Sequence, residues 1–263
     1  MIVKNFIKKI FMKKLLIIFI LFFVATNIYA NTKIIHILVA LCDNKYQGIV
    51  PTSRSLGNGQ NPKTNLYWGA MYGVKSYLNK QKDWELLRLE KVDEIILERV
   101  IFKHKTKDIY IVADAYNGKN MKDALRDYFD YLAGLHIKNI DLQEKTDVDL
   151  VIFVGHNGLM DYSLSEVYKD RIFPSLKNKN SSKQTAVLGC QSQKYFSQIL
   201  KSLYVKSAIL TTGNMAPEGY VVHEVVNGFV NNLSNEEIRK NLGTTYSKYQ
   251  KLKNPAIKLF VHE

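Results

Sequence analysis

Two apolar segments of the sequence end in residues that could perform chemistry together. "DLVIFVGHNGLMD" carries His156 directly after an apolar run, and "QTAVLGCQS" carries Cys190 in the matching place. Gly155 and Gly189 precede them, and glycine permits a sharp exit and a close backbone approach. The two patterns predict that a histidine and a cysteine meet where neighbouring strands end.

A cysteine attacks a carbonyl as its thiolate, which a free thiol of pKa about 8.5 supplies poorly at neutral pH. An imidazole such as that of His156 can take the proton and later protonate the leaving amine. A helix that begins at Gln191 or Ser192 would aim its positive N-terminal end at Cys190. The pair therefore has the residue types of a cysteine acyl-transfer site.

Three further residues complete the predicted site. Backbone amides around Asn157, Gly158 and Cys190 would form an oxyanion hole. Asp161 either orients His156 or caps the segment that starts at Tyr162, and the sequence does not choose between these roles.

The sequence also allows a purely structural use of the two cysteines. Cys42 and Cys190 are the only cysteines, and in an exported protein two cysteines first suggest a disulfide. No Cys or His lies at metal-ligand spacing from another, so the sequence indicates neither a metal nor another cofactor.

The elements that would position these residues alternate along the chain. Short, β-branched apolar runs without alternation are typical of a parallel sheet that is covered on both faces. The predicted strands are 34–41, 84–89, 108–115, 149–155, 185–189 and 207–212. The predicted helices are 65–79, 119–133, one directly after Cys190, one with Pro217 at its first position, and one from a Ser234/Glu237 capping box to about Leu252. We therefore expect one α/β domain, a three-layer αβα sandwich with a mainly parallel sheet.

Polar residues cluster where these strands are expected to end, and the carboxyl edge of such a sheet is where ligands bind. Asp114 is one of them. Residues 43–64 form a long segment rich in glycine that follows the first strand, and loops of this length are usually functional or disordered. We expect this loop to border the site and to shape the substrate cleft.

The first thirty residues have the composition of a secretory signal peptide. Five lysines precede an apolar run from Leu15 to Ala25, and Ile28-Tyr29-Ala30 offers a small residue for cleavage. An uncleaved anchor is the alternative, because the run is close to the lower limit of about 17 residues for a span. We expect an exported protein, periplasmic or secreted, with residues 31–263 as its mature domain and no membrane span after cleavage.

The net charge of +13 is spread along the chain. It contains no run of five or six basic residues and no basic helix face interleaved with aromatic residues, so a solvated surface is favoured over nucleic-acid binding.

The two motifs bring a family into view. An apolar strand ending in His156 with a glycine close behind, followed about three dozen residues later by an apolar strand ending in Cys190, resembles the clan CD cysteine peptidases. That group includes caspases, metacaspases, gingipains, legumain and separase, and the pattern is most similar to bacterial CHAT domains. The chain departs from it at Asn157, where the family usually has glycine, and at Gly189, where alanine is frequent.

The resemblance implies roles for individual residues. His156 would be the catalytic histidine, Cys190 the nucleophile, and Gly158 the glycine whose backbone helps to bind the oxyanion. "TSRS" lies where caspases place an arginine that binds the substrate aspartate, which nominates Arg54.

The caspase-like order also places the histidine strand between the first strand and the cysteine strand. Cys42 would then lie two strand spacings from Cys190, roughly 9–10 Å, beyond the limit of about 7 Å between the Cα atoms of a disulfide. We therefore expect two free thiols, with the His156 ring about 4–6 Å from the Cys190 sulfur, because dyads without substrate are often loose.

Three functions fit these observations to different degrees. The first is an exported, caspase-like cysteine endopeptidase that acts on a polypeptide. The second is a binding or scaffolding module on the same fold, with an inert or disulfide-bonded thiol. The third, a serine hydrolase, has less support because the chain contains no G-x-S-x-G motif. The oligomeric state is left open.

The composition of residues 1–30 generates a prediction about processing. Because a charged start and a short apolar core are removed on export, the mature protein should begin near Asn31. Mass spectrometry of the exported protein measures its N-terminus directly, and an intact leader in the membrane fraction would contradict the signal peptide.

Overall fold

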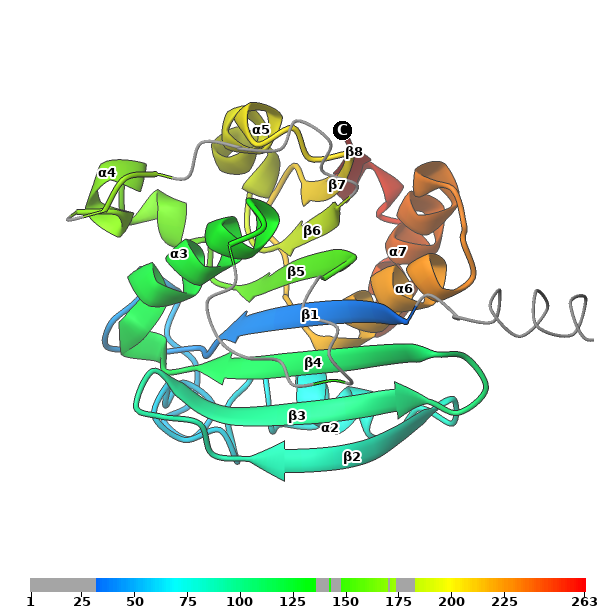
Figure 1. Cartoon of the computed structure of the whole chain (residues 1–263), viewed down its shortest axis with the longest axis horizontal. Helices are drawn as coiled ribbons and strands as arrows, with labels where there is room; N and C mark the ends of the chain where they lie inside the picture. Colours follow the sequence, from blue (N-terminus) through cyan, green and yellow to red (C-terminus); the bar gives the residue numbers. More distant parts are fainter. Residues whose placement is uncertain (1–31, 136–141, 143–147, 170, 174–182) are drawn as a thin grey trace, which may run out of the picture. The chain divides into compact units, whose positions relative to one another are not determined.

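A computed structural model describes residues 32–135, 142, 148–169, 171–173 and 183–263. The predicted signal peptide lies outside these residues. Within them one sheet contains the strands in the order β2-β3-β4-β1-β5-β6-β7-β8 (Figure 1). The strands are β1 (Lys33–Ala40), β2 (Trp84–Glu90), β3 (Ile96–His104), β4 (Ile109–Tyr116), β5 (Leu150–Gly155), β6 (Gln184–Leu188), β7 (Ser207–Thr211) and β8 (Phe260–His262).

The centre of the sheet is parallel, as the continuous apolar runs predict. Strands β4, β1, β5, β6 and β7 pair in parallel, so that their carboxyl ends share one edge. The flanking strands β2, β3 and β8 pair antiparallel. The expected mainly parallel α/β fold is therefore confirmed, and the histidine strand β5 does lie between β1 and the cysteine strand β6.

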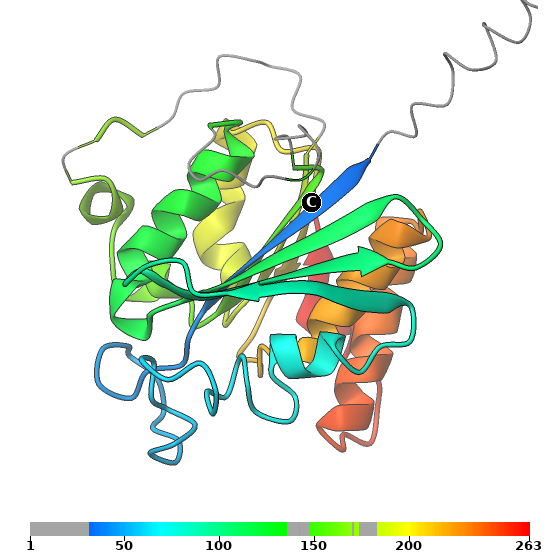
Figure 2. The same cartoon turned by 60° about the horizontal axis from the view of Figure 1, so that its bottom comes forward.

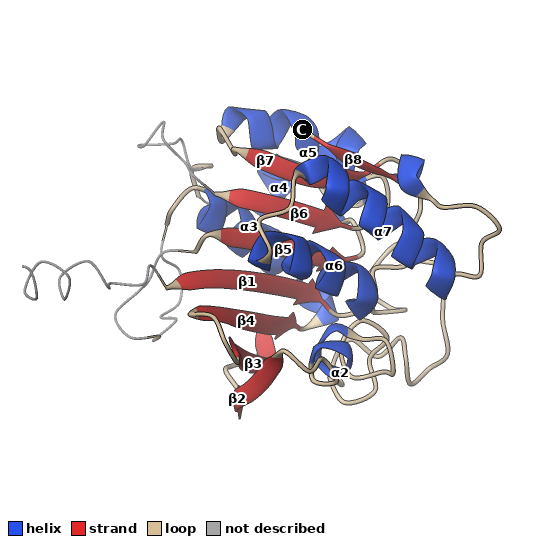
Figure 3. Cartoon of the chain, turned by 90° about the vertical axis from the view of Figure 1, so that its right-hand side faces the viewer, coloured by secondary structure: helices blue, strands red, loops and turns tan. Residues whose placement is uncertain are grey.

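Helices cover both faces of the sheet (Figure 3). They are α2 (Val74–Leu78), α3 (Met121–Leu132), α4 (Leu164–Val167), α5 (Ser192–Ser202), α6 (Gly219–Val230) and α7 (Asn235–Tyr249). One core joins β1 and β5 to α6, α7 and α2, and the other joins them to α3 and α5. Successive strand residues alternate between these cores, which explains why the central strands are apolar on both faces.

Two helix predictions need correction. The segment 65–79 is helical only over α2, and turns occupy its first half. Gly69 and Gly73 lie so close to neighbouring backbone that a Cβ on either would come within 2.4 Å of a carbonyl oxygen, which a regular helix here would not require. Pro217 is not the first helical residue, because α6 begins at Gly219 after Glu218 as its N-cap.

The capping box at the start of α7 is confirmed in both directions. The Ser234 hydroxyl accepts a hydrogen bond from the Glu237 backbone N–H at 3.3 Å. The Glu237 carboxylate in turn accepts one from the Ser234 N–H at 2.8 Å. Two backbone donors that the helix itself leaves free are thereby satisfied.

A buried ion cluster joins three strands beneath α3. Arg99 of β3 donates to both carboxylate oxygens of Asp114 at 2.6 and 2.7 Å. The His36 Nε2 lies 2.9 Å from the same carboxylate, and the exposed fractions of the three residues are 4%, 0% and 0%. Asp114 was expected at the functional edge, and that placement is wrong: it lies inside β4 and neutralises Arg99.

Residues Lys33–Glu263 form one compact unit. None of the helices within the described part of the chain has the length and apolar character that crossing a bilayer requires.

The ion cluster generates a stability prediction. Asp114→Ala leaves Arg99 buried without its counter-charge, and breaking a buried pair costs about 3–5 kcal/mol of unfolding free energy. Although burial alone would raise it, the bonds from Arg99 and His36 lower the pKa of Asp114 from 3.8 to about 2. A depressed carboxyl pKa stabilises the fold above the unfolded-state value and loses that effect as pH falls through the folded one. Urea unfolding at pH 7 and between pH 4 and pH 2 measures both effects.

Glu236→Gln supplies the control, because it removes one carboxylate from the exposed pair with Arg239 on α7. Exposed pairs contribute little, so the variant should unfold like the unmodified protein. Equal unfolding curves for the Asp114 and Glu236 variants would contradict the importance of the buried cluster.

Candidate active site

The ends of β5 and β6 approach each other closely because both carry glycine. The parallel register pairs Val154 with Leu188 in the last turn of the ladder. A Cβ added to Gly189 would lie 2.7 Å from the Gly155 carbonyl oxygen, closer than real Cβ atoms come. Gly155 has a φ of +135°, and a Cβ there would lie 2.6 Å from the Ala40 carbonyl oxygen of β1. The residues that follow directly, a histidine and a cysteine, therefore leave the sheet side by side.

His156 is held by a carboxylate. Its Nε2 lies 2.7 Å from Asp161 Oδ2, and the histidine is only 6% exposed. Ser163 caps α4, so the alternative that Asp161 caps this segment is wrong. With Nε2 engaged, the imidazole has only Nδ1 for chemistry, and in the described part of the chain no residue hydrogen-bonds that nitrogen. The sequence alone did not decide this contact.

Cys190 is partly exposed and lies next to hydrogen-bond donors. Its Sγ is 3.5 Å from the Met215 N–H nitrogen and 3.6 Å from the Met215 carbonyl oxygen. The N–H group can donate to a thiolate, and the carbonyl can accept from a thiol. Helix α5 begins at Ser192, as expected, so its positive end also favours the thiolate.

A strained turn presents the cysteine. Gln191 has a φ of 50°, in the left-handed region that non-glycine residues rarely occupy. Its N–H donates to the Gly213 carbonyl at 2.8 Å, and the Ser192 hydroxyl donates to the Val187 carbonyl at 2.8 Å. The Ser192 N–H also donates to the Thr211 hydroxyl at 3.1 Å. The start of α5 and the end of β7 thereby hold the turn, a role for which the sequence contains no local signal.

No hydrogen bond joins the two candidate catalytic side chains within the described residues. The partner of His156 is Asp161, and the partner of the Cys190 thiol is the Met215 backbone. The separation of about 4–6 Å, which allows for a dyad that tightens around substrate, stays a prediction.

The predicted oxyanion donors have two different environments. The Asn157 side chain is engaged, since its amide nitrogen donates to the Cys190 carbonyl at 2.8 Å and its amide oxygen accepts from the Leu159 N–H. Gly158 packs against α3, where a Cβ would lie 2.4 Å from Met121 Cγ. Across the described chain, the backbone N–H groups of Asn157, Gly158 and Cys190 donate to no other residue. They therefore remain candidates for an oxyanion hole.

Cys42 is the opposite of Cys190 in its surroundings. Both cysteines are free, and Cys42 is 1% exposed. Burial raises the pKa of the Cys42 thiol to about 11. Since β5 separates β1 from β6, the sheet order that argued against a disulfide is the observed one.

The loop over residues 43–64 reaches this edge of the sheet, as predicted. The Gly48 N–H donates to Asp161 Oδ2 at 3.3 Å. Farther along, residues 60–63 line a hollow of about 490 Å³ together with the turn after β2. Figure 2 shows this loop below the carboxyl ends of the strands.

Arg54 lies on the exposed side of the loop. It belongs to a turn that the Gly57 N–H closes onto the Ser53 carbonyl at 2.9 Å. Among the described contacts, none joins Arg54 to His156, Asp161 or Cys190, so its role in binding an acidic side chain stays a prediction.

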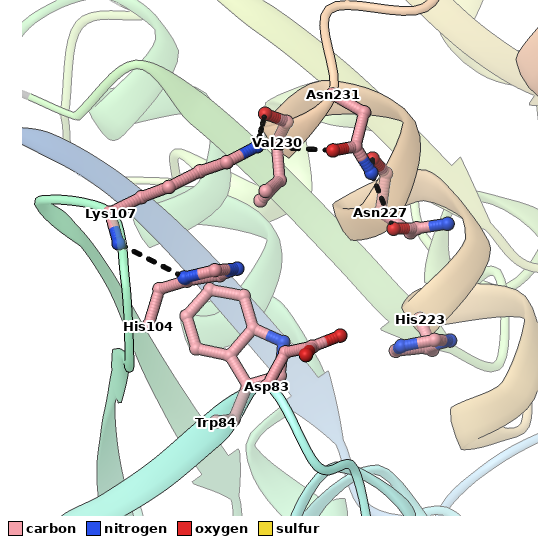
Figure 4. Close-up of a pocket in the computed structure, with 8 residues that line it drawn as sticks. All are labelled: Asp83, Trp84, His104, Lys107, His223, Asn227, Val230 and Asn231. Atoms are coloured by element: carbon pink, nitrogen blue, oxygen red, sulfur yellow. Dashed lines mark hydrogen bonds between the residues drawn. The ribbon is translucent and has the colours of Figure 1, made fainter.

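A second hollow, of about 200 Å³, lies at the opposite edge of the sheet (Figure 4). The His104 ring accepts from the Lys107 N–H at 3.2 Å, and the Lys107 ammonium donates to the Val230 carbonyl at the end of α6. These contacts close a hairpin and a helix end, so the chemistry belongs to the edge that carries His156. Elsewhere too, the described residues contain no cluster of three His, Cys, Asp or Glu side chains suited to a metal ion.

Comparison of the chain with protein-family models, with characterised proteins and with solved structures finds no match.

The contrast between the two thiols generates a labelling prediction. At pH 8 a thiol of pKa about 11 is ionised in about one molecule in a thousand, so iodoacetamide should modify Cys190 and spare Cys42 in the folded protein. Peptide mass spectrometry identifies the site. Cys190→Ala should remain unlabelled until denaturant exposes Cys42. Faster modification of Cys42 than of Cys190 in the native protein would contradict this assignment.

Proposed function

We propose that this chain is a cysteine peptidase of the caspase-like type, which hydrolyses peptide bonds with a His156/Cys190 dyad. The observation that supports this proposal most is the meeting of two adjacent strand ends, one carrying a carboxylate-backed imidazole and the other a thiol at a helix N-terminus. Either residue alone has an ordinary structural explanation, whereas their placement together has a chemical one.

The proposed reaction proceeds in two steps. Cys190 Sγ bonds to the carbonyl carbon of the substrate while its proton passes to His156, and the imidazole gives that proton to the departing amine as the carbon–nitrogen bond breaks. A water molecule then attacks the acyl-enzyme, its proton passes through the same imidazole to the sulfur, and the carboxylic acid product leaves. Asp161 acts as a positioning residue, because its bond to Nε2 leaves Nδ1 as the proton-carrying atom.

Charge develops on the carbonyl oxygen in both steps. The free N–H groups of Cys190 and of the Asn157–Gly158 segment are the donors we assign to it. The Asn157 side chain has a different role: by donating to the Cys190 carbonyl, it ties the histidine strand to the cysteine turn.

The proposal generates a kinetic prediction for residues 31–263. A mixture of peptidyl chloromethyl ketones ending in Arg, Lys, Asp or Leu should add one peptidyl group to the protein, at Cys190. Peptide hydrolysis should vanish in Cys190→Ala and fall by about 10²–10⁴ in His156→Ala, the range for loss of a general acid–base. Mass spectrometry and a fluorogenic peptide assay measure the two effects.

Cys42→Ala is the matched control, since it removes the other thiol from the same edge of the sheet and should keep both labelling and hydrolysis. If none of the four probes labels Cys190 in a folded protein, the peptidase proposal fails, and a binding module on this fold takes its place.

A further inference from the structure

A carboxylate lies beside the candidate nucleophile on the segment that follows β7. Met215 contacts the Cys190 sulfur through both of its backbone polar groups. The next residue, Ala216, donates its N–H to the Tyr246 hydroxyl at 3.1 Å. Its carbonyl accepts from the Glu218 N–H at 3.0 Å. A continuous short path of backbone therefore joins the thiol to Glu218.

The Glu218 carboxylate has no cationic partner. Its recorded contacts are with neutral groups, the Gln250 amide at 3.3 Å and the Tyr220 hydroxyl. The chain has 37 Lys and Arg residues, yet none from its described part forms an ion pair with this half-buried group. Burial raises the pKa of Glu218, so the carboxylate is in an environment that a bound cation would improve.

Two tyrosines line the space between the thiol and the carboxylate. Tyr67 comes from the turns before α2 and Tyr246 from α7, and both are buried. Burial raises the pKa of each hydroxyl, and negative charge on both Cys190 and Glu218 raises it further. Each hydroxyl is therefore close to the two acidic groups at once, which places the three elements around one space.

We propose that Glu218 recognises a lysine or arginine side chain at the substrate position before the cleaved bond, called P1. The inference rests on the proposed peptidase function and assigns its substrate class. A cationic side chain that starts at the carbonyl over Cys190 would pass the rings of Tyr67 and Tyr246, whose faces attract cations, and end at the carboxylate. The charge-assisted hydrogen bonds formed there are stronger than those of Glu218 with its neutral neighbours.

This assignment opposes the acidic preference that Arg54 would confer. Arg54 is exposed on its loop, and charge in bulk water contributes little to selectivity. Glu218 is half-buried and linked to the nucleophile through Met215 and Ala216, so its charge acts in a less polar environment.

The experiment compares fluorogenic peptides that differ only at P1, with Arg, Lys, Leu or Asp, on residues 31–263. Arg and Lys should give the highest kcat/KM. Glu218→Gln keeps the shape and the neutral hydrogen bonds, and it should lower kcat/KM for Arg and Lys about 100-fold, the upper range for one polar contact in a specificity pocket. Its kcat/KM for Leu should stay within about threefold, because that substrate does not use the charge.

Glu224→Gln is the matched control. This glutamate also lies on α6, is half-buried with a raised pKa, and bonds to Thr245 at 2.9 Å away from the thiol. It should leave the P1 preference unchanged. Equal losses for Arg and Leu in Glu218→Gln would assign Glu218 a structural role and overturn the inference.

The remaining outcomes separate this inference from the function on which it rests. Cleavage that depends on Cys190 but favours Asp or Leu would overturn the basic pocket and leave the peptidase intact; a preference for Asp that Arg54→Ala abolishes would assign the pocket to Arg54. The absence of any Cys190-dependent cleavage or labelling would overturn both.

Discussion

The site depends on the close approach of two glycines at the ends of neighbouring strands. Parallel strands lie about 4.8 Å apart, and any side chain on Gly155 or Gly189 would push the strand ends away from each other or from β1. Because the histidine and the cysteine come one residue later, the spacing of the backbone becomes the spacing of the chemistry. The bond from the Asn157 amide to the Cys190 carbonyl closes the same gap from the other side.

Electrostatics then give the two thiols of the chain different properties. Cys42 ends β1 in an apolar core, where burial opposes the charged form and raises its pKa. Cys190 ends β6 at the start of a helix, within reach of the Met215 N–H. The strands that carry them have similar sequences, so the element that follows each cysteine determines its reactivity.

The interior beneath α3 carries the cost of a buried charge. Arg99 enters the sheet on β3, and Asp114 compensates it with two hydrogen bonds while also contacting His36 of β1. A fully bonded cluster of this kind links three strands through side chains as well as through the backbone ladder. Asp114 therefore supports the sheet, while Asp161, five residues after His156, has the polar role at the edge.

The sequence by itself determined the central parallel strands, the capping box at Ser234 and the placement of His156 and Cys190 at strand ends, because each follows from a pattern within a few residues. It missed β3, whose apolar run is interrupted by Glu98 and Arg99, since only the distant Asp114 makes that arginine a core residue. The tertiary structure alone decided that Asp161 binds the imidazole and that Met215 and Glu218 gather around the thiol. Those neighbours lie 25 and 28 positions beyond Cys190 in the chain. Their proximity arises from the pairing of β6 with β7 and the turn into α6, long-range contacts that no local pattern encodes.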